Sequence, residues 1–151
     1  VTVDDACVAL ARLAGGALVT IEATRMAPGR KNALCIELNG ALSSARFELE
    51  RLNELHVYDP SGTAGGFTTR LVTGTDDPYV AQWWPPGHIL GWEHTFVHQF
   101  QDFLEAVAEG RQPQPSFADG LATQSVLHAI SVSAATHAWV EVPTGPGSGP
   151  A

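Results

Sequence analysis

Hydrophobic and polar residues alternate along the first half of the chain, and this pattern predicts a series of β-strands. The runs 6–13 and 17–24 flank Ala14-Gly15-Gly16, a turn whose glycines can adopt positive φ, so a hairpin is expected here. Further strands are predicted over 32–38, 45–50, 55–58 and 67–72. Because the connections between most of these runs are short, the sheet should be largely antiparallel.

The run 45–50 shows how the two faces of a strand are assigned. Its odd positions are apolar and should point inward, whereas Arg46, Glu48 and Glu50 should point outward. Asn39-Gly40, shortly before this run, is a strong local turn signal.

The second half of the chain has helical periodicity. Apolar residues recur on one face over 93–109, and Gly110 stands where a C-terminal cap belongs. Ser116-Phe-Ala-Asp119 has the spacing of a capping box and should open a second helix that runs to about Thr136. A last strand is predicted over 139–142, followed by a Gly/Pro tail, 143–151, that is expected to be disordered.

This order of elements predicts an α+β fold with one open, mostly antiparallel β-sheet and two long helices packed on one face. The other face is rich in small and apolar residues, so we expect it to be available for contact with a second copy of the chain. The domain is expected to span 3–142.

Composition narrows the classes of partner. The 151 residues include sixteen acids and eight bases, with Lys31 as the single lysine, so nucleic acids and anionic membranes are unlikely partners. No apolar run is long enough to cross a bilayer, and no signal peptide is visible.

Cys7 and Cys35 lie in strand-like runs and are predicted to be buried thiols, which favours the cytoplasm. Since the chain starts without Met, we expect it to derive from a longer one.

Four residues of one loop are candidates for ligand binding. Arg25, Arg30, Lys31 and Asn32 offer directed donors to hydroxyl-rich or anionic ligands, although a solvated loop explains them as well. By contrast, no Gly-rich turn follows a strand and opens a helix, so no nucleotide-binding motif is present. A nucleophile elbow and a phosphate loop are also absent from the sequence.

The segment before the first helix adds aromatic and imidazole groups. Its tryptophans, Trp83, Trp84 and Trp92, stack on sugar rings or fill the seam between loop and helix. His94 and His98 could share a metal ion with His88; alternatively, His94 bonds near the helix start and His98 faces solvent. Together with the basic loop, these groups are expected to form half of a pocket that binds a polyol. The sequence shows no complete set of acid and base groups for catalysis.

Several stretches resemble the C-terminal domain of the Gfo/Idh/MocA oxidoreductases. The sheet of that domain is similar to GALVTIEATR (16–25), GRKNALCIELNG (29–40) and FELERLNEL (47–55). The segment PGHILGWEHTF (86–96) is similar to a sugar and cyclitol dehydrogenase branch of the family. The resemblance covers roughly residues 3–142, and it rests on the order in which these stretches follow one another along the chain.

The resemblance implies a two-domain enzyme whose N-terminal Rossmann domain binds NAD or NADP and carries a catalytic lysine. An Asp and a His three residues apart, on a helix that opens the C-terminal domain, act with that lysine. None of these groups is in this chain, so the chain alone is expected to have no catalytic residue, to bind neither cofactor nor metal, and to be inactive. The open sheet face is expected to form a homodimer or homotetramer.

The same resemblance assigns the substrate contacts. Arg30, Lys31 and Asn32 correspond to the sheet loop that contacts substrate hydroxyls. Trp92 and His94, at the start of the long helix, match a second contact region, and His88 lies just before it.

The leading interpretation is therefore the substrate-binding and oligomerisation domain of an NAD(P)-dependent dehydrogenase that acts on CH–OH groups of a sugar or of a cyclitol such as inositol. Two alternatives share the fold: a family member that hydrolyses glycosides through NAD-dependent transient oxidation, and a non-enzymatic assembly module. A zinc site at the three histidines is the fourth possibility.

Overall fold

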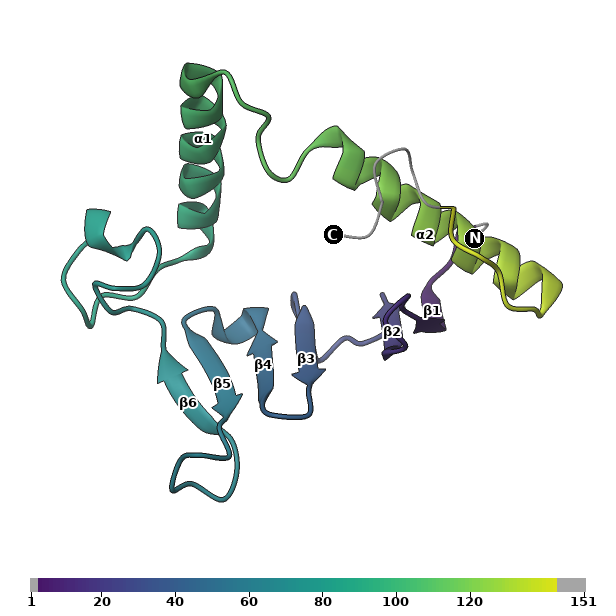
Figure 1. The fold of residues 1–151 in the computed structure, drawn as a ribbon, viewed down its shortest axis with the longest axis horizontal. Helices are drawn as coiled ribbons and strands as arrows, with labels where there is room; N and C mark the ends of the chain where they lie inside the picture. The colour runs from purple at the N-terminus through teal and green to yellow at the C-terminus, as the bar shows by residue number, and fades with distance from the viewer. Residues whose placement is uncertain (1–2, 144–151) are drawn as a thin grey trace. The chain divides into compact units, whose positions relative to one another are not determined.

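The computed structural model describes residues 3–143, in which six strands precede two long helices (Figure 1). The chain divides into two compact units. One contains the residues up to Met26 and those from Gln101 onward, and the other is Ala27–Phe100. Helices and mostly antiparallel strands are segregated along the chain, so the predicted α+β class is confirmed.

The first unit contains the predicted hairpin. Strands β1 (Ala6–Arg12) and β2 (Leu18–Thr24) pair antiparallel, with Ala9 opposite Ile21. The Leu13 N–H donates to the Ala17 carbonyl at 2.9 Å, and Gly16 has a φ of 88°. A glycine suits this position because a side chain is strained at positive φ.

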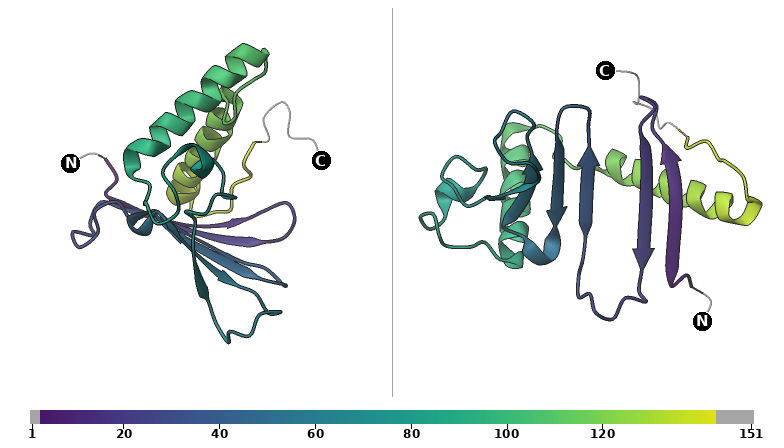
Figure 2. Two further views of the ribbon diagram at one scale, coloured as in Figure 1. Left: turned by 90° about the vertical axis from the view of Figure 1, so that its left-hand side faces the viewer. Right: turned by 90° about the horizontal axis from the view of Figure 1, so that it is seen from below.

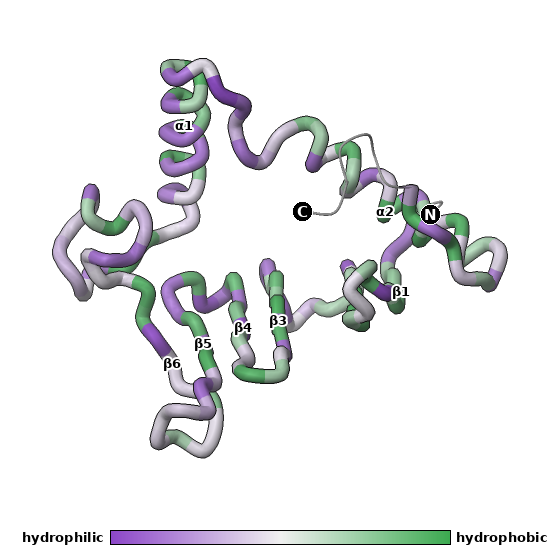
Figure 3. Tube along the Cα trace, in the orientation of Figure 1, coloured by the Kyte–Doolittle hydropathy of each residue, from purple (hydrophilic) through white to green (hydrophobic). Residues whose placement is uncertain are grey.

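Both helices begin and end close to the predicted positions. Helix α1 is Trp92–Glu109 and is followed by Gly110 with a φ of 67°; its hydrophobic and hydrophilic residues lie on opposite sides (Figure 3). Helix α2 is Phe117–Thr136 and starts with the predicted capping box between Ser116 and Asp119. Unlike α1, α2 has apolar residues all around it, which is typical of a helix that packs on more than one side.

The second unit contains a four-stranded antiparallel meander, seen in blue to teal in the right-hand view of Figure 2. Its strands, in spatial and chain order, are β3 (Cys35–Asn39), β4 (Ser44–Glu48), β5 (Glu54–Tyr58) and β6 (Thr68–Leu71). The 3-10 turn η1 (Leu49–Arg51) joins β4 to β5. A second one, η2 (Val80–Gln82), lies in the long connection to α1.

Three details differ from the sequence predictions. The described strands form two sheets and not one, because β2 and β3 share no hydrogen-bonded ladder. Residues 139–142 form no strand, since they pair with no other strand among the described residues. Cys35 is exposed and Cys7 half-buried, so the prediction of two buried thiols is wrong.

Two further predictions concern the packing of the helices and the C-terminal tail. The packing of both helices on one sheet face stays a prediction, and the Gly/Pro tail, apart from Pro143, lies outside the described residues. Neither of the described helices has the length and apolar character that crossing a membrane requires.

Candidate functional site

The basic loop before β3 is held by two glutamates, Glu48 at the end of β4 and Glu50 in the following turn η1. One carboxylate oxygen of Glu50 accepts the backbone N–H of Lys31 at 2.6 Å and that of Asn32 at 3.1 Å. The Arg30 guanidinium donates to Glu48 at 2.9 Å and to the other oxygen of Glu50 at 3.1 Å. Glu48 and Glu50 therefore fix this loop, although alternation along the strand predicts that both face solvent.

The charges of this cluster reinforce one another. The N–H of Lys31 first, then that of Asn32 and the Arg30 guanidinium, lower the pKa of the Glu50 carboxyl below that of an ordinary glutamate. In turn, Glu50 and Glu48 raise the pKa of Arg30. Within residues 3–143 the Lys31 ammonium makes no ion pair. Between residues 29 and 32, Lys31 is thus an exposed cation that a ligand can reach, whereas Arg30 is bound to carboxylates.

A second set of contacts fixes the segment that leads into α1. The side-chain amide of Asn53 donates to the Leu90 carbonyl at 2.7 Å and accepts the Leu90 N–H at 2.9 Å. One residue later, the Gly91 N–H donates to Nδ1 of His94 at 3.0 Å. Because Nδ1 accepts, the ring proton of neutral His94 is on Nε2. The prediction that His94 bonds near the helix start is confirmed.

His98 is enclosed by aromatic groups. The Trp83 indole N–H donates to its Nε2 at 2.7 Å, and the Tyr79 ring stacks on it with a centroid distance of 4.3 Å. The rings of Trp83 and His94 also pack edge to face, with a centroid distance of 4.5 Å. Trp83 therefore packs between loop and helix, one of the two predicted roles, whereas the solvent-facing position predicted for His98 is wrong. Periodicity along α1 could not reveal that the η2 loop covers this residue.

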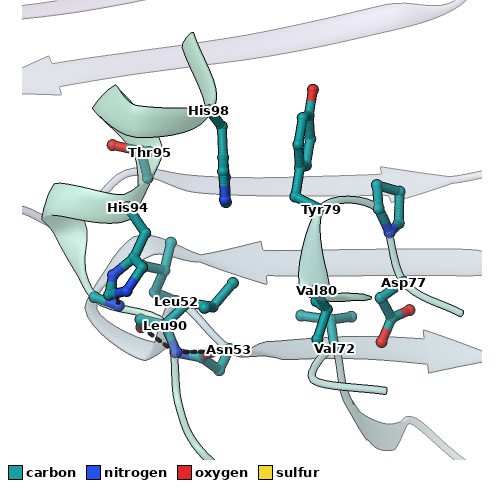
Figure 4. Close-up of a pocket in the computed structure, with 12 residues that line it drawn as sticks. Leu52, Asn53, Val72, Asp77, Tyr79, Val80, Leu90, His94, Thr95 and His98 are labelled. Carbon is teal, nitrogen blue, oxygen red and sulfur yellow. Dashed lines mark hydrogen bonds between the residues drawn. The ribbon is translucent and has the colours of Figure 1, made fainter. Parts of the chain in front are cut away.

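These contacts surround a pocket of about 250 Å³ in the second unit (Figure 4). Its walls are apolar at Leu52, Val72 and Val80, and polar at Asn53, His94 and His98. Of the six predicted substrate-contact residues, His94 is the one that lines it.

The remaining predicted residues lie on nearby segments of the same unit. His88 is in an exposed loop, where Nδ1 meets the Pro85 carbonyl at 2.8 Å and the Trp84 ring lies 5.9 Å away. Trp92 is half exposed and meets Phe96 edge-on at 5.7 Å. Arg30, Lys31 and Asn32 gather at the end of β4, as described above.

The described residues offer few features that a metal ion or a dinucleotide would need. No group of three metal-ligating side chains comes together among them. The first turns of α1 and α2 carry Glu93 and Asp119, and these carboxylates disfavour a pyrophosphate at either helix start. The starts of the two described helices therefore do not fit a pyrophosphate.

The sequence analysis missed Glu50 and Asn53. Two signals were present: acidic residues near the end of β4 complement the basic loop in charge, and an asparagine between two strands is a typical turn residue whose amide bonds to backbone. Neither signal identifies the distant residue to which the side chain bonds.

Fold and site together define an α+β domain with a part-polar pocket beside the start of a long helix. The profile of an oxidoreductase family, the Gfo/Idh/MocA C-terminal alpha/beta domain, matches residues 1–142, and the chain belongs to this family. The resemblance found in the sequence is thus confirmed.

Known relatives are longer proteins. The chain is 41% identical over 146 residues to levoglucosan dehydrogenase from Pseudarthrobacter phenanthrenivorans, covering 95% of this chain and 37% of that protein. Among solved structures, an oxidoreductase domain protein from Kribbella flavida has 52% identity and a TM-score of 0.91, covering 95% of this chain and 39% of that one. Levoglucosan dehydrogenase in complex with NADH and levoglucosan has 40% identity and a TM-score of 0.89, covering 95% and 40%.

Proposed function

We propose that residues 3–142 act as the substrate-binding and oligomerisation domain of an NAD-dependent oxidoreductase that acts on a CH–OH group of a sugar or cyclitol. The observation that carries this proposal is the 41% identity, over 95% of the chain, to levoglucosan dehydrogenase. Structures of levoglucosan dehydrogenase have been solved with NADH and levoglucosan and with NADH and L-sorbose, which favours NAD and a sugar.

In this proposal the chain binds and orients the ring, and the reacting groups come from elsewhere. The Lys31 ammonium and the Asn32 amide donate to substrate hydroxyls from a loop whose backbone is already fixed by Glu50. His94 offers its Nε2–H, while His88 and the half-exposed Trp92 complete the contact region. Ordering the groups before the sugar arrives reduces the entropy cost of positioning it.

The test is Lys31→Ala in the full-length protein. We expect KM for the sugar to rise about tenfold, because a hydrogen bond from a charged donor is lost. The dissociation constant for NAD should stay unchanged, since in this proposal Lys31 contacts the sugar and not the cofactor. Arg111→Ala removes a cation that pairs with Glu109 after the end of α1 and serves as the control. An unchanged KM in Lys31→Ala would remove Lys31 from the site.

The substrate itself is identified by turnover of the full-length protein with levoglucosan, inositols and hexoses. A ketone product supports a dehydrogenase, whereas release of a free sugar from a glycoside supports the hydrolytic alternative.

The oligomerisation role is supported by one face of the β1–β2 hairpin. Val8, Leu10 and Leu18 lie on this face, and each is at least 67% exposed. Apolar residues gathered in this way are typical of an interaction surface. We propose that this face contacts a second copy in a homodimer or homotetramer.

A further inference from the structure

We propose that Glu50 and Asn53, the β4–β5 brace, are positioning residues that hold the two sugar-contact segments in place. Glu50 fixes the loop 29–32, and Asn53 fixes the segment 88–94 that enters α1. The inference rests on the proposed function, because it takes these two segments as the sugar contacts.

Glu50 fixes the first segment through its backbone. The N–H groups of Lys31 and Asn32 converge on a single carboxylate oxygen, and the second oxygen accepts from Arg30. Two consecutive N–H groups directed at one atom restrict the rotation of the peptide between them. The directions in which the Lys31 and Asn32 side chains leave the backbone are thereby set.

Asn53 fixes the second segment in a different way. Its amide bonds to both the N–H and the carbonyl of Leu90, as the dashed lines in Figure 4 show. A donor and an acceptor on one planar group hold a residue in position and orientation together. The neighbouring Gly91 N–H then donates to His94, so the orientation of that ring depends on where Asn53 holds Leu90.

The brace itself is anchored in the meander. The Leu49 N–H donates to the Leu34 carbonyl at 2.9 Å, and the Val72 N–H donates to the Asn53 carbonyl at 3.0 Å. Glu50 and Asn53 are separated by Arg51 and Leu52 alone, within and just after η1. A single short turn, held from both sides, therefore fixes both segments.

The test uses Glu50→Gln and Asn53→Asp in the full-length enzyme, with the sugar that it oxidises fastest. Both substitutions keep the side-chain size. The first places an amide N–H₂ group where a carboxylate oxygen accepts hydrogen bonds, and the second opposes the Leu90 carbonyl with another acceptor. We expect KM for the sugar to rise about tenfold in each variant, the change that loss of a charge-assisted or buried hydrogen bond produces. KM for NAD should stay within about twofold of the wild-type value.

Glu54→Gln is the matched control. Glu54 pairs with Arg51 of the same turn at 2.9 Å, and the contacts of its carboxylate are with Arg51 and His56 and not with either segment. This variant should keep the wild-type KM. An equal rise in Glu54→Gln, or a parallel rise in KM for NAD, would show general loosening of the domain and overturn the proposal.

A double mutant separates positioning from stability. If Glu50 acts through Lys31, Glu50→Gln should raise KM clearly less in the Lys31→Ala background than in the wild type. Equal effects in both backgrounds would overturn the role of Glu50.

A wrong proposed function and a wrong role for the brace give different experimental results. If Lys31→Ala alone leaves KM unchanged, the sugar assignment fails, and amide hydrogen exchange at Lys31 and Asn32 then tests the brace. Faster exchange in Glu50→Ala, which has no acceptor for these N–H groups, supports it, and unchanged exchange refutes it.

Discussion

His98 illustrates how a single contact determines the chemistry of a side chain. Because Nε2 accepts the Trp83 N–H, that lone pair is already engaged, and the ring is held against Tyr79. Tyr79 has a φ of 65°, a left-handed backbone conformation that is costly for a residue with a large side chain. The stacking on His98 helps to offset this cost. The Trp83 hydrogen bond and the stacking on Tyr79 therefore hold His98 in place.

The Trp83–His98 hydrogen bond is tested by Trp83→Phe in the full-length protein. The change removes the indole N–H and leaves Nε2 of half-buried His98 without its donor, so the free energy of unfolding should fall by about 1 kcal/mol. Trp84→Phe removes the same atoms from a residue that is 73% exposed and should have little effect. Denaturant unfolding measures both. Equal losses would show that the Trp83–His98 bond contributes nothing specific.

At the scale of the element, the start of α2 is set by the Ser116–Asp119 capping box. The Ser116 N–H first, and then its hydroxyl, lower the pKa of the Asp119 carboxyl below that of an ordinary aspartate. A group whose pKa is lower in the folded state adds stability above its unfolded pKa and loses it as the pH falls. This contribution is therefore present at neutral pH and disappears below about pH 4.

Two variants of the full-length protein test this cap. Ser116→Ala should reduce the free energy of unfolding by about 1 kcal/mol, whereas Ser125→Ala, in the middle of the same helix, should cost less. The stability difference between the wild type and Asp119→Asn should shrink as the pH is lowered from 7 toward 3. A difference that does not change with pH would contradict the assigned role of the carboxylate.

Elements defined by local signals could be predicted from the sequence, and those that need a distant partner could not. The capping box, Gly110 and the β1–β2 turn depend on residues a few positions apart, and all three are confirmed. Residues 139–142 have strand-like residues but no partner strand among those described. In the site, crowded charges indicated the loop 29–32, whereas Glu50 and Asn53 were missed because their partners are 18 to 37 positions away.

At the scale of the whole molecule, the hairpin face predicts the association state. Leu10→Asp introduces a charge among apolar residues of β1 and should shift the full-length protein from an oligomer toward the monomer. Leu42→Asp makes the same change in the exposed turn between β3 and β4 and is the control. Light scattering over a concentration series measures the mass. If both variants keep the mass of the wild type, the hairpin face is not the contact.

The position of the β4–β5 brace also restricts how chain length can vary among relatives. An insertion or deletion of one residue between Glu50 and Asn53 would displace one relative to the other and disconnect at least one segment from its support. The loop between β5 and β6, which neither brace residue contacts, can lengthen or shorten at little cost. Length differences among functional homologues should therefore accumulate in the connection between β5 and β6 and be absent from the connection between β4 and β5.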